Sequence, residues 1–224
     1  MRDQALRETV VAAARRMVEL GLTHGTSGNV SVRAGPGFVI TPTAVPWHLL
    51  VPDDLVRQDA AGVAEPGAGA PSTEWRIHRD IYAARAETGA VVHAHPPYAT
   101  AIACLRMDLP AVHYMVAVAG GASVRCAEYA TFGTAKLSAA ALAALEGRKA
   151  CLLANHGIVA LGADLGEALR VAEEIERVSQ VYLFALSAGT PRILDDAEML
   201  RVLQRFESYG RPLPPASSGG RGGT

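Results

Sequence analysis

The spacing of apolar residues along the chain predicts helices and strands in alternation. Residues 3–20 carry an apolar stripe at helical spacing, and Gly21 follows where a helix commonly stops. The strand-like runs VSVR and FVIT come next, on either side of an AGPG turn. Further helices are predicted over 73–87 with Ser72 as the N-cap, over ATAIACL, over TAKLSAAALAALEG, over 165–188 and over 195–208.

The remaining apolar runs predict strands. GAVVHAH and PAVHYMV are each typical of one strand, and ACLLANHGIVALG is typical of two strands around an Asn-His-Gly turn. Residues 57–71 are rich in Ala, Gly and Pro and predict a surface loop, whereas 212–224 are low in complexity and predict a disordered tail. Because helices and strands are interspersed, we expect one α/β domain over 1–211, with a sheet covered on both faces.

Composition excludes several classes of function. The 224 residues are 50% hydrophobic with a formal net charge of −1, so there is no large basic field to attract nucleic acid or anionic lipid. The apolar runs fall short of the ~20 residues that a membrane span needs, and the N-terminus lacks an apolar signal core. Three cysteines, odd in number and beside apolar segments, fit a reduced cytoplasmic protein.

Three histidines are candidates for a metal site. His93 and His95 are two apart in a predicted strand, so both side chains project to the same face and can bind one ion. Taken alone, the pair fits hydrogen-bonded histidines at the rim of a core equally well. His156 lies in the predicted turn and could simply be a turn residue. Together the three histidines are typical of a site for a catalytic divalent ion.

Other side chains leave two interpretations open. Glu74 can be a favourable first-turn charge on a helix dipole, or a carboxylate that binds the metal or moves a proton. The segments THGTSGNVS, TPT and Ser72-Thr73 offer neutral donors that can bind phosphate, although turns are commonly rich in such residues. Neither Lys136 nor Lys149 lies where a Schiff base would form, so carbonyl chemistry would have to rely on a metal.

The motifs, taken in order, resemble one family of enzymes. GLTHGTSGNVSVR, ITPT, PSTEWRIHRDIY, AVVHAHPPYATA, PAVHYMVAVAGG, CAEYATFGT and LLANHGIVALG together look like the class II, metal-dependent aldolases of the L-fuculose-1-phosphate aldolase type. These aldolases share a superfamily with L-ribulose-5-phosphate 4-epimerase. The resemblance runs from residue 5 to about residue 210.

The resemblance implies a fold and an assembly. We expect a three-layer αβα domain with a central mixed, largely antiparallel sheet, assembled as a homotetramer with each site at a subunit interface. One divalent metal per subunit is implied, Zn²⁺ first, with Mn²⁺ or Co²⁺ as alternatives.

It also implies a role for each matching residue. His93, His95 and His156 would be metal ligands, Glu74 a fourth ligand that becomes the acid/base, and Tyr114 a second catalytic residue acting across a subunit boundary. The implied phosphate pocket consists of Gly28, Asn29, Thr43, Ser72 and Thr73, while Phe132 and Tyr209 would line the aldehyde end and the C-terminal cover.

Two positions depart from the family pattern. Ala44 stands where a glycine is frequent, and Thr73 where a serine is frequent. Because alanine reaches positive φ less easily than glycine, these departures bear on the detailed shape of the phosphate pocket and not on its existence.

The implied reaction is reversible cleavage of a ketose 1-phosphate, such as L-fuculose 1-phosphate, to dihydroxyacetone phosphate and a small aldehyde such as L-lactaldehyde. Alternatives are a sugar-phosphate 4-epimerase or another lyase of the superfamily: a 5-deoxypentulose-1-phosphate aldolase, a decarboxylase or a dehydratase. A non-catalytic scaffold domain would be expected to lack the metal ligands, and all three histidines and Glu74 are present.

Overall fold

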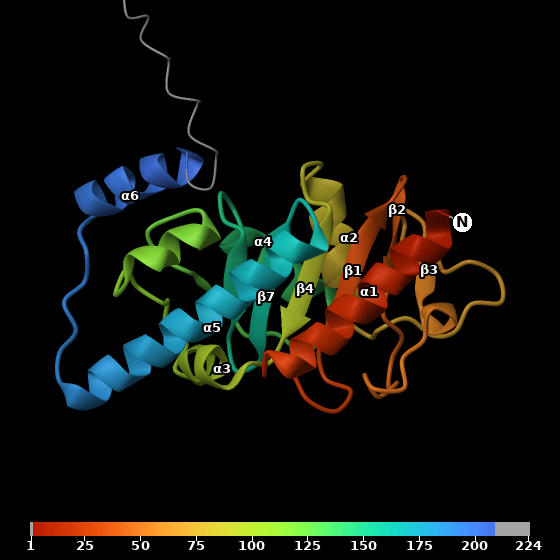
Figure 1. Ribbon diagram of the computed structural model, residues 1–224, viewed down its shortest axis with the longest axis horizontal. Helices are drawn as coiled ribbons and strands as arrows, with labels where there is room; N and C mark the ends of the chain where they lie inside the picture. Colours follow the sequence, from red (N-terminus) through yellow and green to blue (C-terminus); the bar gives the residue numbers. More distant parts are fainter. Residues whose placement is uncertain (1, 209–224) are drawn as a thin grey trace, which may run out of the picture.

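A computed structural model describes residues 2–208 and contains one seven-stranded sheet in that range (Figure 1). The order across the sheet is β3-β2-β1-β4-β7-β6-β5. Neighbouring strands among these seven are antiparallel, except that β5 is parallel to β6. The strands are β1 (Asn29–Ala34), β2 (Gly37–Ile40), β3 (Val56–Gln58), β4 (Ala90–Ala94), β5 (Cys126–Ala127), β6 (Ala150–Leu153) and β7 (Gly157–Gly162).

Helices cover both faces of this sheet. In Figure 1, α1 and α5 cross one face, and α2 and α4 lie behind the other. The α-helices are α1 (Arg2–Glu19), α2 (Trp75–Ala84), α3 (Pro97–Cys104), α4 (Ala135–Ala144), α5 (Leu165–Ala188) and α6 (Asp196–Ser208). Two 3₁₀ helices, η1 (Pro52–Asp54) and η2 (Tyr114–Ala119), complete the list for the described range. The predicted three-layer αβα fold with a mixed, largely antiparallel sheet is confirmed.

Alternation along the strands divides the interior into two cores. Val30 and Val32 of β1 belong to a core formed with α1, α3 and α5, which includes Met17 and Ile175. The opposite face packs on α2 and α4 in a smaller core. On β1 this second face carries Ser31, fully buried, instead of an apolar residue. Strand periodicity therefore turns polar side chains of β1 toward α2.

The prediction of a strand for PAVHYMV is wrong, because η2 occupies Tyr114–Ala119. The imidazole Nδ1 of His113 accepts the Met115 N–H and starts the helical turn, and Gly120 at φ 85° ends it. Apolar side chains of η2 belong to the core that α5 lines. Tertiary packing and this local cap therefore override the strand preference of Val and Tyr.

The helix predicted over 73–87 is shorter than expected. Helix α2 begins at Trp75, and Glu74 occupies the N-cap position. The Ser72 hydroxyl accepts the Glu74 N–H at 3.3 Å, so Ser72 shapes the approach to the helix and is not its N-cap. The loop predicted over 57–71 overlaps the last two residues of β3 and is irregular after that strand. The two-residue strand β5 was not predicted.

Two further expectations concern a membrane span and the C-terminal end of the chain. No helix in this part of the chain is long and apolar enough to cross a membrane. The predicted cover residue Tyr209 and the tail over 212–224 lie outside the described residues.

Candidate metal centre

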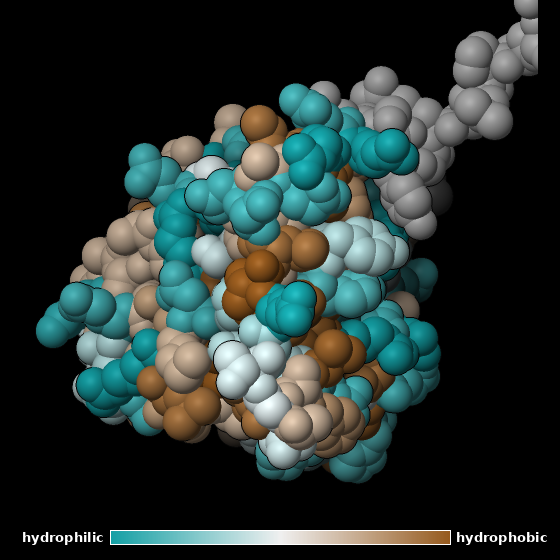
Figure 2. Space-filling model, turned by 90° about the vertical axis from the view of Figure 1, so that its left-hand side faces the viewer, coloured by the Kyte–Doolittle hydropathy of each residue, from teal (hydrophilic) through white to brown (hydrophobic). Residues whose placement is uncertain are grey.

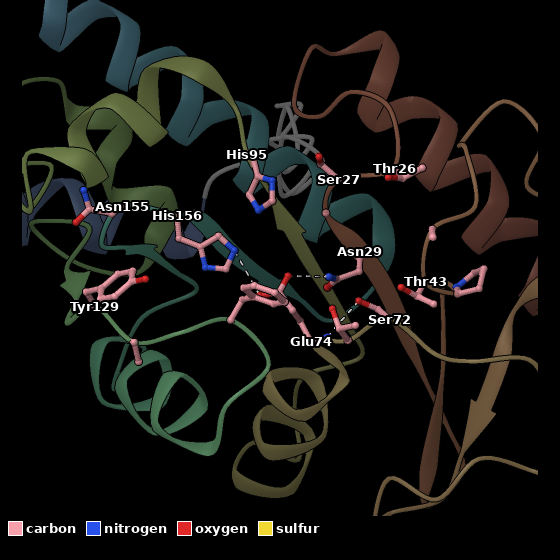
Figure 3. A pocket seen from close by; sticks show the side chains of 16 residues that line it. Thr26, Ser27, Asn29, Thr43, Ser72, Glu74, His95, Tyr129, Asn155 and His156 are labelled. Atoms are coloured by element: carbon pink, nitrogen blue, oxygen red, sulfur yellow. Dashed lines mark hydrogen bonds and ion pairs between the residues drawn. The ribbon is translucent and has the colours of Figure 1, made fainter.

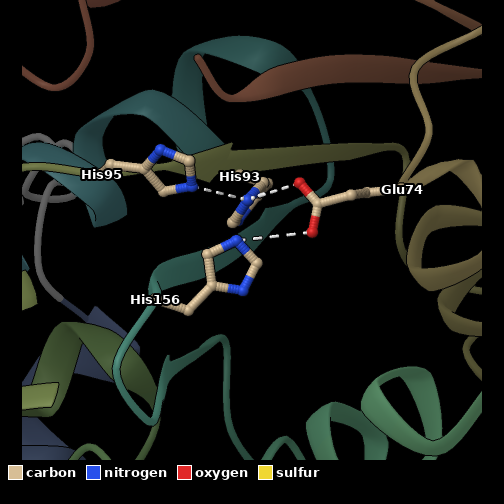
Figure 4. Close-up of side chains that lie close together, drawn as sticks. All are labelled: Glu74, His93, His95 and His156. Carbon is tan, nitrogen blue, oxygen red and sulfur yellow. Dashed lines mark hydrogen bonds and ion pairs between the residues drawn. The ribbon is translucent and has the colours of Figure 1, made fainter. Parts of the chain in front are cut away.

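Four side chains from three separate segments converge at one end of the sheet. His93 is on β4, His95 follows that strand, His156 lies in the turn between β6 and β7, and Glu74 caps α2. Their ligand atoms all lie within 4.8 Å of one another (Figure 4). Pairing of β4 with β7, which sets Ala94 opposite Ile158, brings the two histidine-bearing segments together. The arrangement that the three histidines predicted is therefore present.

Backbone geometry holds the His156 turn close to β4. Asn155 adopts φ 53°, the left-handed conformation that asparagine tolerates better than most residues. A Cβ added at Gly157 would lie 2.3 Å from the Ala94 oxygen and 2.6 Å from the His95 ring. Glycine is thus required at 157 for the turn to approach His95 this closely.

Hydrogen bonding fixes the tautomer of His93. Its Nδ1 lies 2.8 Å from the Ile158 carbonyl oxygen, which only accepts, so Nδ1 carries the proton and Nε2 has the lone pair. This Nε2 lies 2.9 Å from Glu74 Oε2 and 3.0 Å from His95 Nε2. A lone pair facing a carboxylate oxygen and a second ring nitrogen calls for a proton or a cation between them.

A second observation tests the fit of a metal. Glu74 Oε1 is buried without a hydrogen-bond partner among the described residues and lies 3.4 Å from His156 Nε2. A buried carboxylate oxygen left in this way is costly unless a cation satisfies it. Three imidazole nitrogens and a carboxylate are also a usual donor set for divalent ions such as Zn²⁺. The four residues therefore fit a divalent metal ion.

Electrostatics keep most of these donors in the form that binds metal. Burial lowers the pKa of His95 to about 3 and that of His156 to about 4, and the positive charge of His93 adds to both shifts. Burial acts to raise the pKa of Glu74, but the three histidines together hold it well below its usual range. Burial also lowers the pKa of His93, yet the adjacent Glu74 carboxylate outweighs burial and raises it overall. Without a metal, His93 is thus the first of the three rings to gain a proton as pH falls.

The cluster lies beside an open cavity of about 320 Å³ (Figure 3). Figure 3 shows Thr43 and Ser72 on one side of Glu74, and Tyr129 and Asn155 on the other side of His156. Among the described residues that line the cavity, none is lysine or arginine. The Thr43 side therefore offers neutral donors only. All five residues predicted to bind phosphate line the cavity: Gly28, Asn29, Thr43, Ser72 and Thr73.

The other predicted residues fall in different places. Phe132 lines the cavity and is 63% exposed. Tyr114 is on η2, is half exposed, and is not one of the residues that line the cavity of its own chain. Ala44 lines the cavity and adopts φ 58°, so it reaches the left-handed conformation for which glycine would be better suited.

Sequence reasoning missed part of the site. Tyr129 lines the cavity within the quoted YATFGT motif but was not singled out. Ser31, predicted as a possible phosphate donor, is instead fully buried and lies 2.6 Å from His78 Nδ1. His78 also contacts Asn29 Oδ1, whose amide nitrogen lies 3.3 Å from Glu74 Oε2. The four-residue spacing of Glu74 and His78 on α2 was the available signal.

Comparisons with known proteins identify the family. Residues 8–183 match the model of the class II aldolase and adducin N-terminal domain. A 5-methylthioribulose-1-phosphate/5-deoxyribulose-1-phosphate aldolase of Rhodospirillum rubrum is 50% identical, with 95% of this chain and 97% of that protein aligned. An L-fuculose phosphate aldolase of Escherichia coli is 44% identical over 94% of this chain and 98% of its own length. A solved L-fuculose 1-phosphate aldolase superimposes with a TM-score of 0.88 at 41% identity, covering 91% of this chain and 96% of that one.

The chain therefore belongs to the class II aldolase and adducin N-terminal domain family. Its relatives of known activity and its group of one glutamate and three histidines place it among the class II aldolases, which are aldehyde-lyases.

Proposed function

We propose that this enzyme cleaves a ketose 1-phosphate reversibly between C3 and C4, yielding dihydroxyacetone phosphate and a small aldehyde. The observation that carries the proposal is the position of the Glu74 and histidine cluster beside a cavity that is also lined by neutral hydrogen-bond donors. A ketose 1-phosphate needs both features, one for its carbonyl and one for its phosphate. The division of the cavity in Figure 3 supports this orientation of the substrate.

His93, His95, His156 and Glu74 would hold one divalent metal, and three nitrogen ligands favour Zn²⁺. The metal would act as a Lewis acid that polarises the substrate carbonyl and stabilises the negative charge produced when the C3–C4 bond breaks. The absence of any lysine lining the cavity among the described residues supports this choice over Schiff-base chemistry.

The chain's own residues would move the protons. Tyr114 of a neighbouring subunit, as the phenolate, would take the C4 hydroxyl proton as the bond breaks. Glu74, displaced from the metal by the substrate and protonated, would then deliver its proton to C3 as a carboxylic acid. Exchange of one proton with solvent at each group would restore both starting forms. In the direction of synthesis, Glu74 would remove the C3 proton. Gly28, Asn29, Thr43, Ser72 and Thr73 would hold the phosphate, and Phe132 and Tyr209 would enclose the aldehyde end.

The comparisons favour a particular class of ketose. The relative at 50% identity is named for 5-methylthioribulose 1-phosphate and 5-deoxyribulose 1-phosphate, and the relative at 44% for L-fuculose phosphate. We therefore place a 5-deoxy- or 5-methylthio-pentulose 1-phosphate ahead of L-fuculose 1-phosphate. Cleavage would then release acetaldehyde or its methylthio derivative instead of L-lactaldehyde. Tyr129, Ala130 and Phe132 along the cavity suit an aldehyde without a hydroxyl.

The proposed assembly is a homotetramer, since Tyr114 needs a neighbour to reach a cavity. Figure 2 shows apolar residues gathered on the end of the molecule toward which α5 runs. Along this part of α5, Val181, Phe184 and Leu186 are exposed. Exposed apolar surface of this kind is typical of an interface. Light scattering after size exclusion would test the number of subunits.

The test of the function is a panel of 5-deoxyribulose, 5-methylthioribulose and L-fuculose 1-phosphates, assayed for release of dihydroxyacetone phosphate with and without chelator. We expect release from the two pentuloses at higher kcat/KM than from L-fuculose 1-phosphate, and none after metal removal. Release from none of the three would overturn the proposal. Conversion of L-ribulose 5-phosphate to its 4-epimer without fragment release would instead identify an epimerase.

A further inference from the structure

A chain of buried hydrogen bonds runs from the metal cluster into the interior between α2 and β1. His78 and Tyr82 lie on one stripe of α2, four and eight residues after its N-cap Glu74, and Asn29 and Ser31 are two apart on the facing side of β1. All five side chains are at least 93% buried. We call these five side chains the polar seam.

The seam has one consistent direction. An ionised carboxylate only accepts hydrogen bonds, so Glu74 Oε2 must accept from the amide nitrogen of Asn29, 3.3 Å away. The carbonyl end of the Asn29 amide, Oδ1, therefore faces Nε2 of His78. Since Oδ1 has no proton to give, His78 Nε2 must donate. The orientation of Asn29 is thus determined from both ends.

The rest of the seam follows from the protonation of His78. Its ring is fully buried and hydrogen-bonds to no carboxylate among the described residues, and burial lowers its pKa to about 3, so the ring is neutral. With the proton on Nε2, Nδ1 accepts from the Ser31 hydroxyl at 2.6 Å. Ser31 Oγ then accepts from the Tyr82 hydroxyl at 2.8 Å. Every hydroxyl and ring proton in the seam points toward Glu74.

We propose that His78, as the neutral ring protonated at Nε2, is a positioning residue that fixes the Asn29 amide with its NH₂ group toward Glu74 and the cavity. The amide nitrogen carries two protons, and the bond to Glu74 uses one. The second remains available to a substrate oxygen, because Asn29 lines the cavity. This part of the inference rests on the proposed function, whereas the orientation of Asn29 and of Glu74 does not.

Spectroscopy of the ring nitrogens tests the tautomer directly. A long-range ¹H–¹⁵N correlation spectrum of the wild-type protein, with and without Zn²⁺, reports which nitrogen of each histidine carries a proton. The signals lost in His78→Gln assign the ring. We expect a neutral His78 with its proton on Nε2 in both states. A proton on Nδ1, or on both nitrogens, would overturn the proposal.

Substitutions along the seam test the positioning role. His78→Leu leaves Asn29 attached at one end only, so Zn²⁺ affinity and kcat/KM should each fall by about 10–100-fold, the range for partners that orient a ligand. His78→Gln keeps an amide donor near Nε2 and should recover most of the loss. Ser31→Ala should cost about fivefold, and Tyr82→Phe about twofold or less, because their hydroxyls lie farther along the chain of donors. His48→Gln, an exposed histidine outside the seam, is the control and should change neither quantity.

Thermal unfolding of each variant separates positioning from folding. A loss of stability in His78→Leu with unchanged Zn²⁺ affinity and KM would show a structural role only and overturn the proposal. If His78→Leu does not fold, Ser31→Ala decides by the same two measurements. Equal losses in Tyr82→Phe and Ser31→Ala would contradict the assigned direction. If the wild type released no dihydroxyacetone phosphate, the proposed function would fail, while Zn²⁺ affinity and the tautomer would still decide the role of His78.

Discussion

The two ends of the cavity are built in opposite ways. At the metal end, His93 is fully buried and Glu74 is 7% exposed. His93 donates a hydrogen bond to the Ile158 carbonyl oxygen, and Glu74 accepts one from the Asn29 amide, and these bonds hold them in place. At the other end, Tyr129 is 50% exposed and Phe132 is 63% exposed. One end is thus assembled inside a single chain, and the other consists of side chains at the surface. Substitutions at the surface end can change substrate choice without disturbing the metal end, and the predictions below test that separation.

Loss of a metal ligand should have the largest effect. His95→Ala removes one ring nitrogen from the cluster, and we expect Zn²⁺ content after dialysis to fall to near zero. Because Lewis-acid stabilisation is worth several kcal/mol, release of dihydroxyacetone phosphate should fall by roughly 10³-fold or more. Metal analysis and steady-state kinetics beside His48→Gln would check this. Full Zn²⁺ content with a wild-type rate would exclude His95 as a ligand.

Replacing the proposed proton carrier should come next. Glu74→Gln keeps the shape of the side chain but cannot deliver a proton, so cleavage should slow by at least about 10²-fold. Substrate KM should change little, since the phosphate donors are untouched. A cleavage rate within a few-fold of wild type would show that Glu74 is not the acid/base.

The pH dependence of metal binding should reveal one proton and not three. The pKa values of His95 and His156 are lowered to about 3 and about 4, whereas the pKa of His93 is raised, so His93 is the first of the three rings to gain a proton as pH falls. As pH falls below the pKa of His93, Zn²⁺ affinity should therefore drop about tenfold per pH unit. Calorimetry in buffers of different ionisation enthalpy would count the protons. Release of two or three protons near pH 6 would contradict this electrostatic assignment.

A substitution at the surface end should change selectivity and leave the metal in place. Phe132→Ala should alter the ratio of kcat/KM between 5-deoxyribulose 1-phosphate and L-fuculose 1-phosphate by about tenfold, the effect of a changed apolar contact. Zn²⁺ content should stay at the wild-type value. Loss of metal in this variant would show that the two ends are not independent.

The smallest effect is expected at Ala44, which lines the cavity at φ 58°. Ala44→Gly relieves the left-handed backbone and should raise the free energy of unfolding by about 1 kcal/mol, or Tm by about 2–4 °C. Ala101→Gly in the exposed face of α3 is the matched control and should lower stability. Kinetics within about twofold of wild type would accompany the gain. A lower Tm for Ala44→Gly would mean that the alanine makes a compensating contact.

The sequence predicted the parts of this molecule that depend on local pattern. The helices near both ends, the strand before His95 and the turn at His156 follow from periodicity and turn chemistry, and they brought the three histidines together as expected. The segment at Tyr114 did not follow, because the His113 imidazole and packing on α5 decide its conformation.

The partners of His78 were also beyond the sequence. Its spacing from Glu74 and Tyr82 can be found in the sequence, but the packing of α2 against β1 cannot. Without knowledge of that packing, nothing in the sequence distinguished His78 from a histidine with no role. Contacts between a helix and a strand some 50 residues away depend on the whole fold, which periodicity alone does not specify.

The polar seam also has a consequence for how the chain folds. Strand β1 places Val30 and Val32 toward α1, and Asn29 and Ser31 toward α2. If β1 slipped by one residue against β4 during folding, Asn29 and Ser31 would enter the apolar core beneath α1. Each polar group left without a partner there would cost about 1–3 kcal/mol. A strand with apolar side chains on both faces would tolerate such a slip. The polar seam of β1 does not, so it destabilises misregistered intermediates and favours a single strand pairing.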